Sequence, residues 1–174
     1  MEDMGRKKQH IEKGFLWNVE VLKHGKGLIK IHSIIDRTAS DFPKLMQIAK
    51  HFASDGAVVE LTPTFSRPDG IIYKSIYGNL VGTKYYGKCP DLKINGLWYE
   101  HEGFKSGKPK NAYRNMMNNG LKQSSRLIID QPELNDTYIK KSIYRRTKVY
   151  NQAIDELWIR TDENVRLLYK RLKE

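Results

Sequence analysis

Cysteine is scarce in this chain: Cys89 is the one cysteine among 174 residues. A single cysteine excludes a disulfide within the chain, and it excludes a zinc site built from several thiolates. Cytoplasmic proteins keep their thiols reduced and rarely contain disulfides, so this composition favours a cytoplasmic setting.

Long apolar stretches are also missing from the sequence. No run of about 18 apolar residues occurs, so we predict no membrane span. Residues 1–13 are charged and lack the apolar stretch of a signal peptide, and we expect this N-terminus to be disordered. No repeat and no linker rich in proline, glycine or serine interrupts the rest. We therefore expect residues 14–174 to form a single domain.

Acidic residues are too few to balance the basic ones. The 31 Lys and Arg residues exceed the 20 Asp and Glu residues, and the formal net charge at pH 7 is +11. Such a surplus attracts a polyanion through its phosphates, whatever the sequence of that polyanion. A basic protein that binds no nucleic acid has the same composition, so charge alone leaves both interpretations open.

The spacing of apolar residues predicts strands interspersed with helices. Strands are predicted at 15–22, 28–35, 57–62, 91–94, 97–103, 125–130, 156–160 and 165–169. Helices are predicted from Ser40 or Asp41 to Gly56, at 110–119 with Gly120 at the end, and at 136–148. We interpret residues 63–89 as a long, partly β excursion. This order is typical of α/β or α+β architecture, and we expect an α/β fold with a mixed β-sheet flanked by helices and a β-hairpin at each end of the domain.

The dipeptide Asn95-Gly96 is the strongest local signal for a two-residue β-hairpin. A loop of this length would pair Asp91 with Glu100 and place Glu102 one diagonal step away on the same face. The opposite face would be apolar and would suit the core, with Leu92, Ile94, Leu97 and Tyr99. His101 also falls on that apolar face, which favours a packing role for it over a catalytic one.

Opposed carboxylates destabilise a sheet unless a cation bridges them or one takes up a proton. A hard cation such as Mg²⁺ or Mn²⁺ prefers oxygen ligands, and Mg²⁺ keeps several waters. It could polarise a phosphate and lower the pKa of a bound water. The alternative is an acidic but solvated strand face, and a slip of one residue in register would break the alignment.

Pro90-Asp91, followed after a spacer by Glu100-His101-Glu102, resembles the P-D…(D/E)-x-K signature of restriction-endonuclease-like nucleases. The predicted helix and strand within residues 48–60 resemble the nuclease domains at the C-termini of contact-dependent growth-inhibition toxins. The resemblance covers about half the chain and implies a restriction-endonuclease-like fold. Members of the toxin group cut DNA or tRNA with a divalent metal.

The resemblance implies that Asp91 and Glu100 are metal ligands. Glu102 stands where the family usually has a lysine that orients the attacking water, so we expect it to hold metal or to position water. Lys105 or Lys93 would then supply the missing positive charge. Two further polar residues, Glu60 and Gln123, are additional candidates; for Glu60, an exposed strand residue is the alternative.

Basic residues follow the predicted hairpin closely and could contact phosphates. The candidate nucleic-acid contacts are Lys93, Lys108, Lys110, Arg114, Lys122 and Arg126. A second basic group, within residues 140–148, could track a nucleic-acid backbone, solubilise the chain or meet an acidic inhibitor protein. The sequence predicts a metal-dependent nuclease. The alternatives are a catalytically inactive nucleic-acid-binding domain of the same fold and a module that binds an acidic protein.

Overall fold

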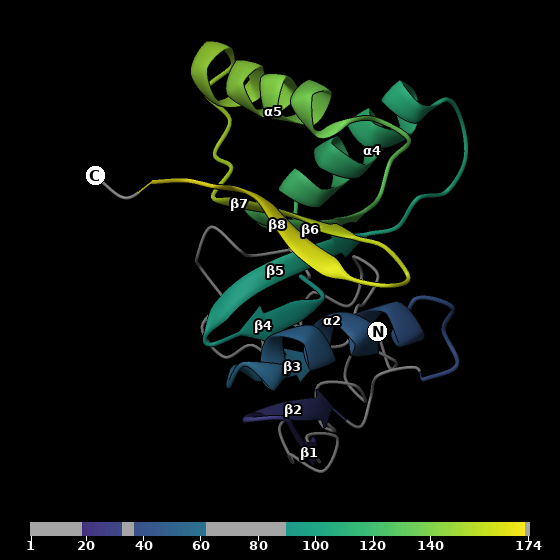
Figure 1. The fold of residues 1–174 in the computed structure, drawn as a ribbon, viewed down its shortest axis with the longest axis vertical. Coiled ribbons are helices and arrows are strands. Elements are labelled where there is room, and N and C mark those ends of the chain that lie inside the picture. Colours follow the sequence, from purple (N-terminus) through teal and green to yellow (C-terminus); the bar gives the residue numbers. More distant parts are fainter. Residues whose placement is uncertain (1–18, 33–36, 62–89, 173–174) are drawn as a thin grey trace, which may run out of the picture. The chain divides into compact units, whose positions relative to one another are not determined.

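The computed structural model describes residues 19–32, 37–61 and 90–172. These residues form eight strands, three α-helices and one π-helical turn, which confirms the predicted α/β class (Figure 1). The predicted disordered N-terminus and the excursion at 63–89 lie outside the described residues. No helix of the described part is long and apolar enough to cross a membrane.

Contacts divide the chain into two compact units, residues 1–97 and 98–174. Compact units of this kind can belong to one domain or to two, so the single domain expected for residues 14–174 stays a prediction.

The first unit contains a four-stranded mixed sheet. Its elements are β1 (Val19–His24), β2 (Gly27–His32), α2 (Phe42–Ser54), β3 (Val58–Leu61) and β4 (Leu92–Ile94). Strands β1 and β2 form the predicted N-terminal hairpin, β2 pairs in parallel with β3, and β3 pairs antiparallel with β4. Parallel neighbours need a crossover connection, and α2 lies within the connection between β2 and β3.

Helix α2 has the start and the end that the sequence predicts. Asp41 is its N-cap residue and a proline occupies the first turn, where a missing N–H costs nothing. Gly56, with φ of +109°, follows the helix end. The buried face packs into the core of this unit and consists of Leu45, Ile48, Ala49 and Ala53.

Gly27 brings β2 unusually close to the end of α2. A Cβ at this position would lie 2.2 Å from the carbonyl oxygen of Ala57 and 2.5 Å from that of Ala53. The Leu28 N–H also donates to the Ala57 carbonyl at 3.1 Å. Only glycine permits this approach, so the contact between strand and helix depends on the missing side chain.

The second unit contains three parallel strands and a final hairpin. Its elements are β5 (Leu97–Glu102, which begins at the last residue of the first unit), α4 (Pro109–Leu121), β6 (Arg126–Asp130), α5 (Asp136–Tyr144), the π-turn η3 (Arg145–Val149), β7 (Glu156–Arg160) and β8 (Val165–Lys170). Strands β5, β6 and β7 are parallel neighbours, and β8 returns antiparallel to β7. The predicted C-terminal hairpin is therefore confirmed.

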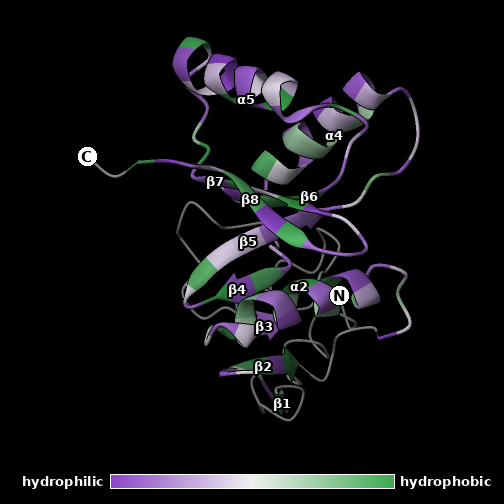
Figure 2. Cartoon of the chain, viewed as in Figure 1, coloured by the Kyte–Doolittle hydropathy of each residue, from purple (hydrophilic) through white to green (hydrophobic). Residues whose placement is uncertain are grey.

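Helices α4 and α5 lie on the same side of the β6–β7–β8 strands (Figure 1). Between helices and strands lies one apolar cluster: Tyr113, Met116, Met117, Leu127, Ile129, Ile139, Ile143, Ile154, Leu157 and Ile159. Figure 2 shows mainly hydrophilic residues along α5, as expected of a helix that buries only one face.

Three local predictions in this part of the chain are wrong. Gly120 lies inside α4, which ends at Leu121. A Cβ at position 120 would lie 2.8 Å from Cδ2 of Leu127, so the glycine there serves close packing. The helix predicted at 136–148 changes to a π-turn after Tyr144. Leu97 was expected in the core but is 43% exposed, and Tyr144, the last residue of α5, is exposed as well.

Candidate functional site

The Asn95-Gly96 turn has the conformation that its sequence predicts. Strand β4 ends at Ile94, and β5 begins at Leu97. The φ angles of the two turn residues are +48° and +81°, and a type I′ hairpin turn requires positive φ at both. The backbone of Asn95 donates to the Val58 carbonyl at 2.9 Å, and its side-chain Oδ1 accepts from the Val58 N–H at 2.9 Å. The turn is therefore tied to the start of β3.

The two carboxylates nearest this turn are buried. Asp91 is 6% exposed and Glu100 is 7% exposed. Their burial contradicts the alternative in which they form a solvated acidic face. Asp91 belongs to the first unit and Glu100 to the second, so their direct pairing stays a prediction from the turn register.

Glu102 is half-buried near the end of β5, and its side chain is confined by helix α4. Its Cγ lies 3.1 Å from the point that a Cβ on Gly120 would occupy. A larger residue at position 120 would displace Glu102, so the glycine in α4 helps to set where this carboxylate lies.

Among the described residues, no group of three or more His, Cys, Asp or Glu side chains is placed to hold a metal ion. The metal site at Asp91, Glu100 and Glu102 therefore stays a prediction that rests on the motif and the turn. Two buried carboxylates still suit Mg²⁺, because this ion often takes one or two protein carboxylates and completes its shell with waters and substrate phosphates.

The predicted basic contacts fall into two groups. Five are exposed on the β5–α4 connection, on α4 or just after it: Lys105, Lys108, Lys110, Arg114 and Lys122. Lys93 is half-buried and is the register partner of the half-buried Glu60 across β3 and β4. Opposite charges in such a position attract, so a structural role for this pair competes with a role in the site. Gln123, an additional polar candidate without charge, is half-buried as well.

Arg126 engages in ion pairs within the second unit. Its Nε lies 3.2 Å from Oε2 of Glu156, and its Nη2 lies 4.0 Å from Oδ2 of Asp155. The hydroxyl of Tyr99 donates to both oxygens of Glu156 at 2.8 Å. Burial, followed by this hydrogen bond, raises the pKa of Tyr99 above its ordinary value, so the phenol stays protonated.

A further cluster of buried polar groups lies at the ends of the parallel strands, and sequence reasoning missed it. Oδ1 of Asp130, the last residue of β6, contacts Nε2 of His101 at 2.8 Å and accepts from Nε of Arg160 at 2.5 Å. Its Oδ2 accepts from the Phe104 N–H at 3.1 Å. All three charged or titratable side chains are buried. His101 is thus buried, as expected, but its ring contacts the carboxylate of Asp130.

The partner of Arg160 decides the protonation behaviour of this cluster. Burial alone would lower the pKa of the guanidinium, but the hydrogen bond and the charge of Asp130 outweigh it and raise that pKa. Nη1 of Arg160 also donates to Oδ1 of the exposed Asp162 at 3.1 Å. The guanidinium of Arg160 therefore stays protonated at all ordinary pH values.

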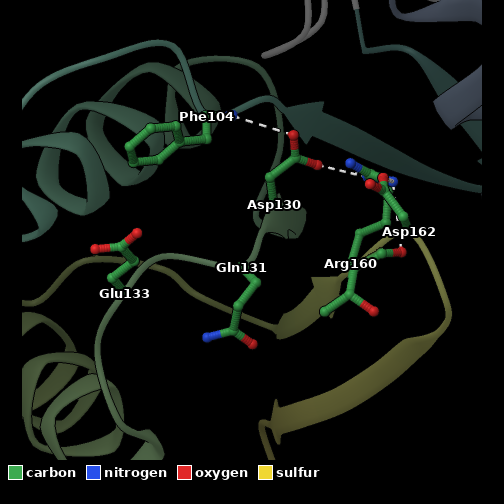
Figure 3. Close-up of a pocket in the computed structure, with 7 residues that line it drawn as sticks. Phe104, Asp130, Gln131, Glu133, Arg160 and Asp162 are labelled. Carbon is green, nitrogen blue, oxygen red and sulfur yellow. Dashed lines mark hydrogen bonds and ion pairs between the residues drawn. The ribbon is translucent and has the colours of Figure 1, made fainter.

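A pocket of about 310 Å³ opens beside this cluster, and Figure 3 shows Asp130 between Phe104 and Arg160 within it. Its lining consists of Phe104, Asp130, Gln131, Glu133, Arg160, Thr161 and Asp162. It lies at the carboxyl ends of β6 and β7, the edge at which open α/β sheets bind ligands. Three carboxylates against one arginine make it suited to hydrogen-bond donors and unsuited to a phosphate.

No protein-family model, curated protein or solved structure was found to match this chain. The resemblance to restriction-endonuclease-like nucleases therefore depends on the motif residues in the sequence and on the surroundings of those residues.

Proposed function

We propose that this protein is a metal-dependent nuclease of restriction-endonuclease-like fold that cleaves phosphodiester bonds of DNA or tRNA. One observation carries the proposal: Asp91 and Glu100, the two acidic positions of the motif, are buried on either side of a fixed two-residue turn. A divalent cation prefers oxygen ligands, and Mg²⁺ is usually held by one or two protein carboxylates together with waters and substrate phosphates. Two buried carboxylates beside a fixed turn match that requirement.

Asp91 and Glu100 would be the protein ligands of Mg²⁺ or Mn²⁺, with hard oxygen donors that suit either ion. When bound, the metal supplies polarisation of the phosphate and a lower pKa for an attacking water. Glu102, confined against Gly120, would orient that water by accepting a hydrogen bond from it. Lys105 follows β5 directly and is exposed, so its ammonium is available to the phosphate charge.

The exposed basic residues of the β5–α4 segment would hold the phosphate backbone. Lys108, Lys110 and Arg114 lie at or near the start of α4. Cations there, together with the free N–H groups of a helix N-terminus, attract phosphate oxygens. These contacts would position the substrate and carry no sequence information of their own.

Cleavage of labelled DNA and tRNA tests the proposal directly. We expect Mg²⁺ or Mn²⁺ to support cleavage and a chelator to abolish it. Asp91→Asn and Glu100→Gln should each reduce the rate by about a hundredfold or more, the scale seen when a charge-stabilising group is removed. Glu163→Gln, a change at an exposed acid in the β7–β8 turn, is the matched control and should leave the rate unchanged.

Thermal unfolding with and without Mn²⁺ gives a readout that does not depend on catalysis. An ion that binds the native state stabilises it by mass action, so Mn²⁺ should raise the Tm of the wild type. The same addition should leave the Tm of Asp91→Asn unchanged. Chelator-resistant cleavage, or equal activity of wild type and Asp91→Asn, would overturn the proposal.

Glu102 favours a second candidate, a nucleic-acid-binding domain of the same fold without catalysis, because it replaces the lysine of the motif. Its binding should be sensitive to salt, independent of metal and unchanged by Asp91→Asn. No cleavage under any metal condition, combined with such binding, would favour this candidate over the nuclease.

A further inference from the structure

Helix α5 and the π-turn that follows it display an unusual set of side chains to solvent. We call them the α5–η3 surface, which comprises the exposed residues Lys140, Lys141, Tyr144, Arg145, Lys148 and Tyr150. Tyr144 is 66% exposed and Tyr150 is 60% exposed. The opposite side of α5 packs into the core through Ile139 and Ile143.

The π-turn is what brings Tyr150 to the surface, whereas Tyr144 is exposed at the end of α5 itself. In a continuing α-helix, the face of Ile139 and Ile143 would return near positions 146, 147 and 150. The Tyr150 N–H instead donates to the Arg145 carbonyl at 3.2 Å, five residues back, and η3 buries no residue. Short π-turns within helices are rare and are frequent at functional sites.

Side-chain hydrogen bonds, and not apolar burial, hold this turn in place. Nη1 of Arg146 donates to Oδ1 of Asn118 in α4 and to Oε1 of Gln152, both at 3.0 Å. The hydroxyl of Thr147 donates to the Ile143 carbonyl at 2.9 Å. Hydrogen bonds to α4 and to the residues on either side of the turn therefore fix its conformation, and the exposed groups on it have defined positions.

Arg145 and Tyr150 contact each other on this surface. The guanidinium carbon of Arg145 lies 5.6 Å from the centre of the Tyr150 ring, and its Nη2 donates to the Tyr150 hydroxyl at 3.2 Å. Planar guanidinium and phenol groups are the side chains on which unpaired bases stack.

The net charge of the segment is positive. Residues 136–152 contain five basic residues, Lys140, Lys141, Arg145, Arg146 and Lys148, and one acidic residue, Asp136. That carboxylate already receives two hydrogen bonds of 2.8 Å from Arg166. The exposed field of the segment is therefore positive, and it complements phosphate.

We propose that the α5–η3 surface binds single-stranded nucleic acid, with bases stacked on Tyr144 and Tyr150 and phosphates on the lysines and Arg145. Stacking tolerates any base because every base has a π-face, and the cations follow the backbone. A duplex hides its base faces and would use only the cations. This proposal rests on the proposed function for its biological meaning, since the strand bound here would be the nuclease substrate, but the binding itself needs no catalysis.

Fluorescence anisotropy with labelled oligoadenylate and a labelled duplex, measured in chelator across a salt series, tests it. The double variant Tyr144→Ala/Tyr150→Ala should weaken single-strand binding about tenfold or more, given the usual effect of losing a stacked base. Tyr144→Phe/Tyr150→Phe keeps both rings and should restore binding to the wild-type level. Duplex affinity should change little in either variant.

A second set of variants separates local from overall charge. Replacing Lys140, Lys141 and Lys148 with Gln should reduce the slope of log K against log salt by about 2, from three contacts of about 0.7 each. Replacing three exposed lysines of the first unit, Lys23, Lys26 and Lys50, removes the same charge and should change the slope far less.

Three outcomes would overturn the inference. They are unchanged single-strand binding by the alanine double variant, equal losses from the two lysine triples, and full displacement of the oligonucleotide by polyglutamate at equal charge. The last would indicate a surface for an acidic protein. Because the chelator stops metal-dependent cleavage, these binding results would stand even if the nuclease proposal failed. Failed binding at this surface would likewise leave the test of nuclease activity with Asp91→Asn unaffected.

Discussion

Two buried carboxylates of the second unit, Glu156 and Asp130, have partners from other strands. Glu156 accepts from Tyr99 and, at 3.0 Å, from the indole of Trp158, and it pairs with Arg126. Such networks hold a charge inside a protein only while every partner is present. The second unit should therefore respond sharply to the loss of single polar atoms.

Tyr99→Phe removes one hydroxyl and leaves the rest of the side chain. We expect a loss of about 1–3 kcal/mol in the free energy of unfolding, because a hydrogen bond to a buried carboxylate is lost. Urea unfolding measures it, and Tyr144→Phe at an exposed position should have no effect. Since the pKa of Tyr99 is raised in the folded state, its contribution is complete below about pH 10 and falls as the pH rises further. A gap between wild type and variant that widens above that pH would contradict this account.

Arg160→Met should be among the most damaging changes in this unit. It leaves the Asp130 carboxylate buried without its guanidinium, which costs about 3–5 kcal/mol when a buried pair is broken. Adding Asp130→Asn removes the stranded charge. The double variant should therefore be more stable than the sum of the two single losses, as urea unfolding can show. Additive losses would mean that the two residues do not interact.

At the scale of elements, glycines define where strand and helix can meet. Gly27→Ala places a Cβ against backbone atoms of residues 53 and 57, which cannot move like a flexible side chain. We expect a loss of about 3 kcal/mol, at the upper end for overpacking. Gly96→Ala is the matched comparison, because its Cβ meets nothing within 4 Å and only its φ of +81° is unfavourable. That strain should cost about 1–2 kcal/mol by chemical denaturation. Equal losses would refute the steric explanation.

Local signals explain which elements could be predicted. Asn95-Gly96, Pro43 and Gly56 each act within a few residues, so the central hairpin turn and helix α2 follow from the sequence alone. The alternation at the N- and C-terminal hairpins is equally local.

The contacts of Asp130 could not be predicted in the same way. His101 and Arg160 lie 29 and 30 residues from it, and they meet it only because β6 lies between β5 and β7. No local pattern fixes that strand order. The available clue was polar residues directly after apolar strands. The π-turn was missed because a helix with one longer turn keeps its apolar spacing up to Ile143.

At the scale of the whole molecule, the excess of positive charge should make the free energy of unfolding fall as the pH is lowered. Lowering the pH protonates carboxylates and increases a net charge that is already +11 at pH 7. The hydrogen bond from Arg166 lowers the pKa of Asp136. Its stabilisation is therefore present above the ordinary value of about 3.9 and is lost as the pH falls below it.

We expect the urea midpoint to fall between pH 7 and pH 3 and to recover partly with added salt, which screens the repulsion. Asp136→Asn should lower stability at pH 7 by less than about 1 kcal/mol, because this pair is half-exposed and solvent screens it. The difference from wild type should shrink near pH 3. A midpoint independent of both pH and salt would show that overall charge has no such effect.

The Asn95-Gly96 turn also bears on the chemical lifetime of the protein. An asparagine followed by glycine loses its amide readily, because the next backbone nitrogen can attack the side-chain carbonyl and close a succinimide ring. In the folded chain, that carbonyl is held by the Val58 N–H, and the backbone of Asn95 is fixed by its bond back to Val58. Separation of the turn from β3 would break both hydrogen bonds. The rate of deamidation at residue 95 should therefore be low in the native state and should rise once the first unit unfolds. Mass spectrometry of stored protein measures this rate.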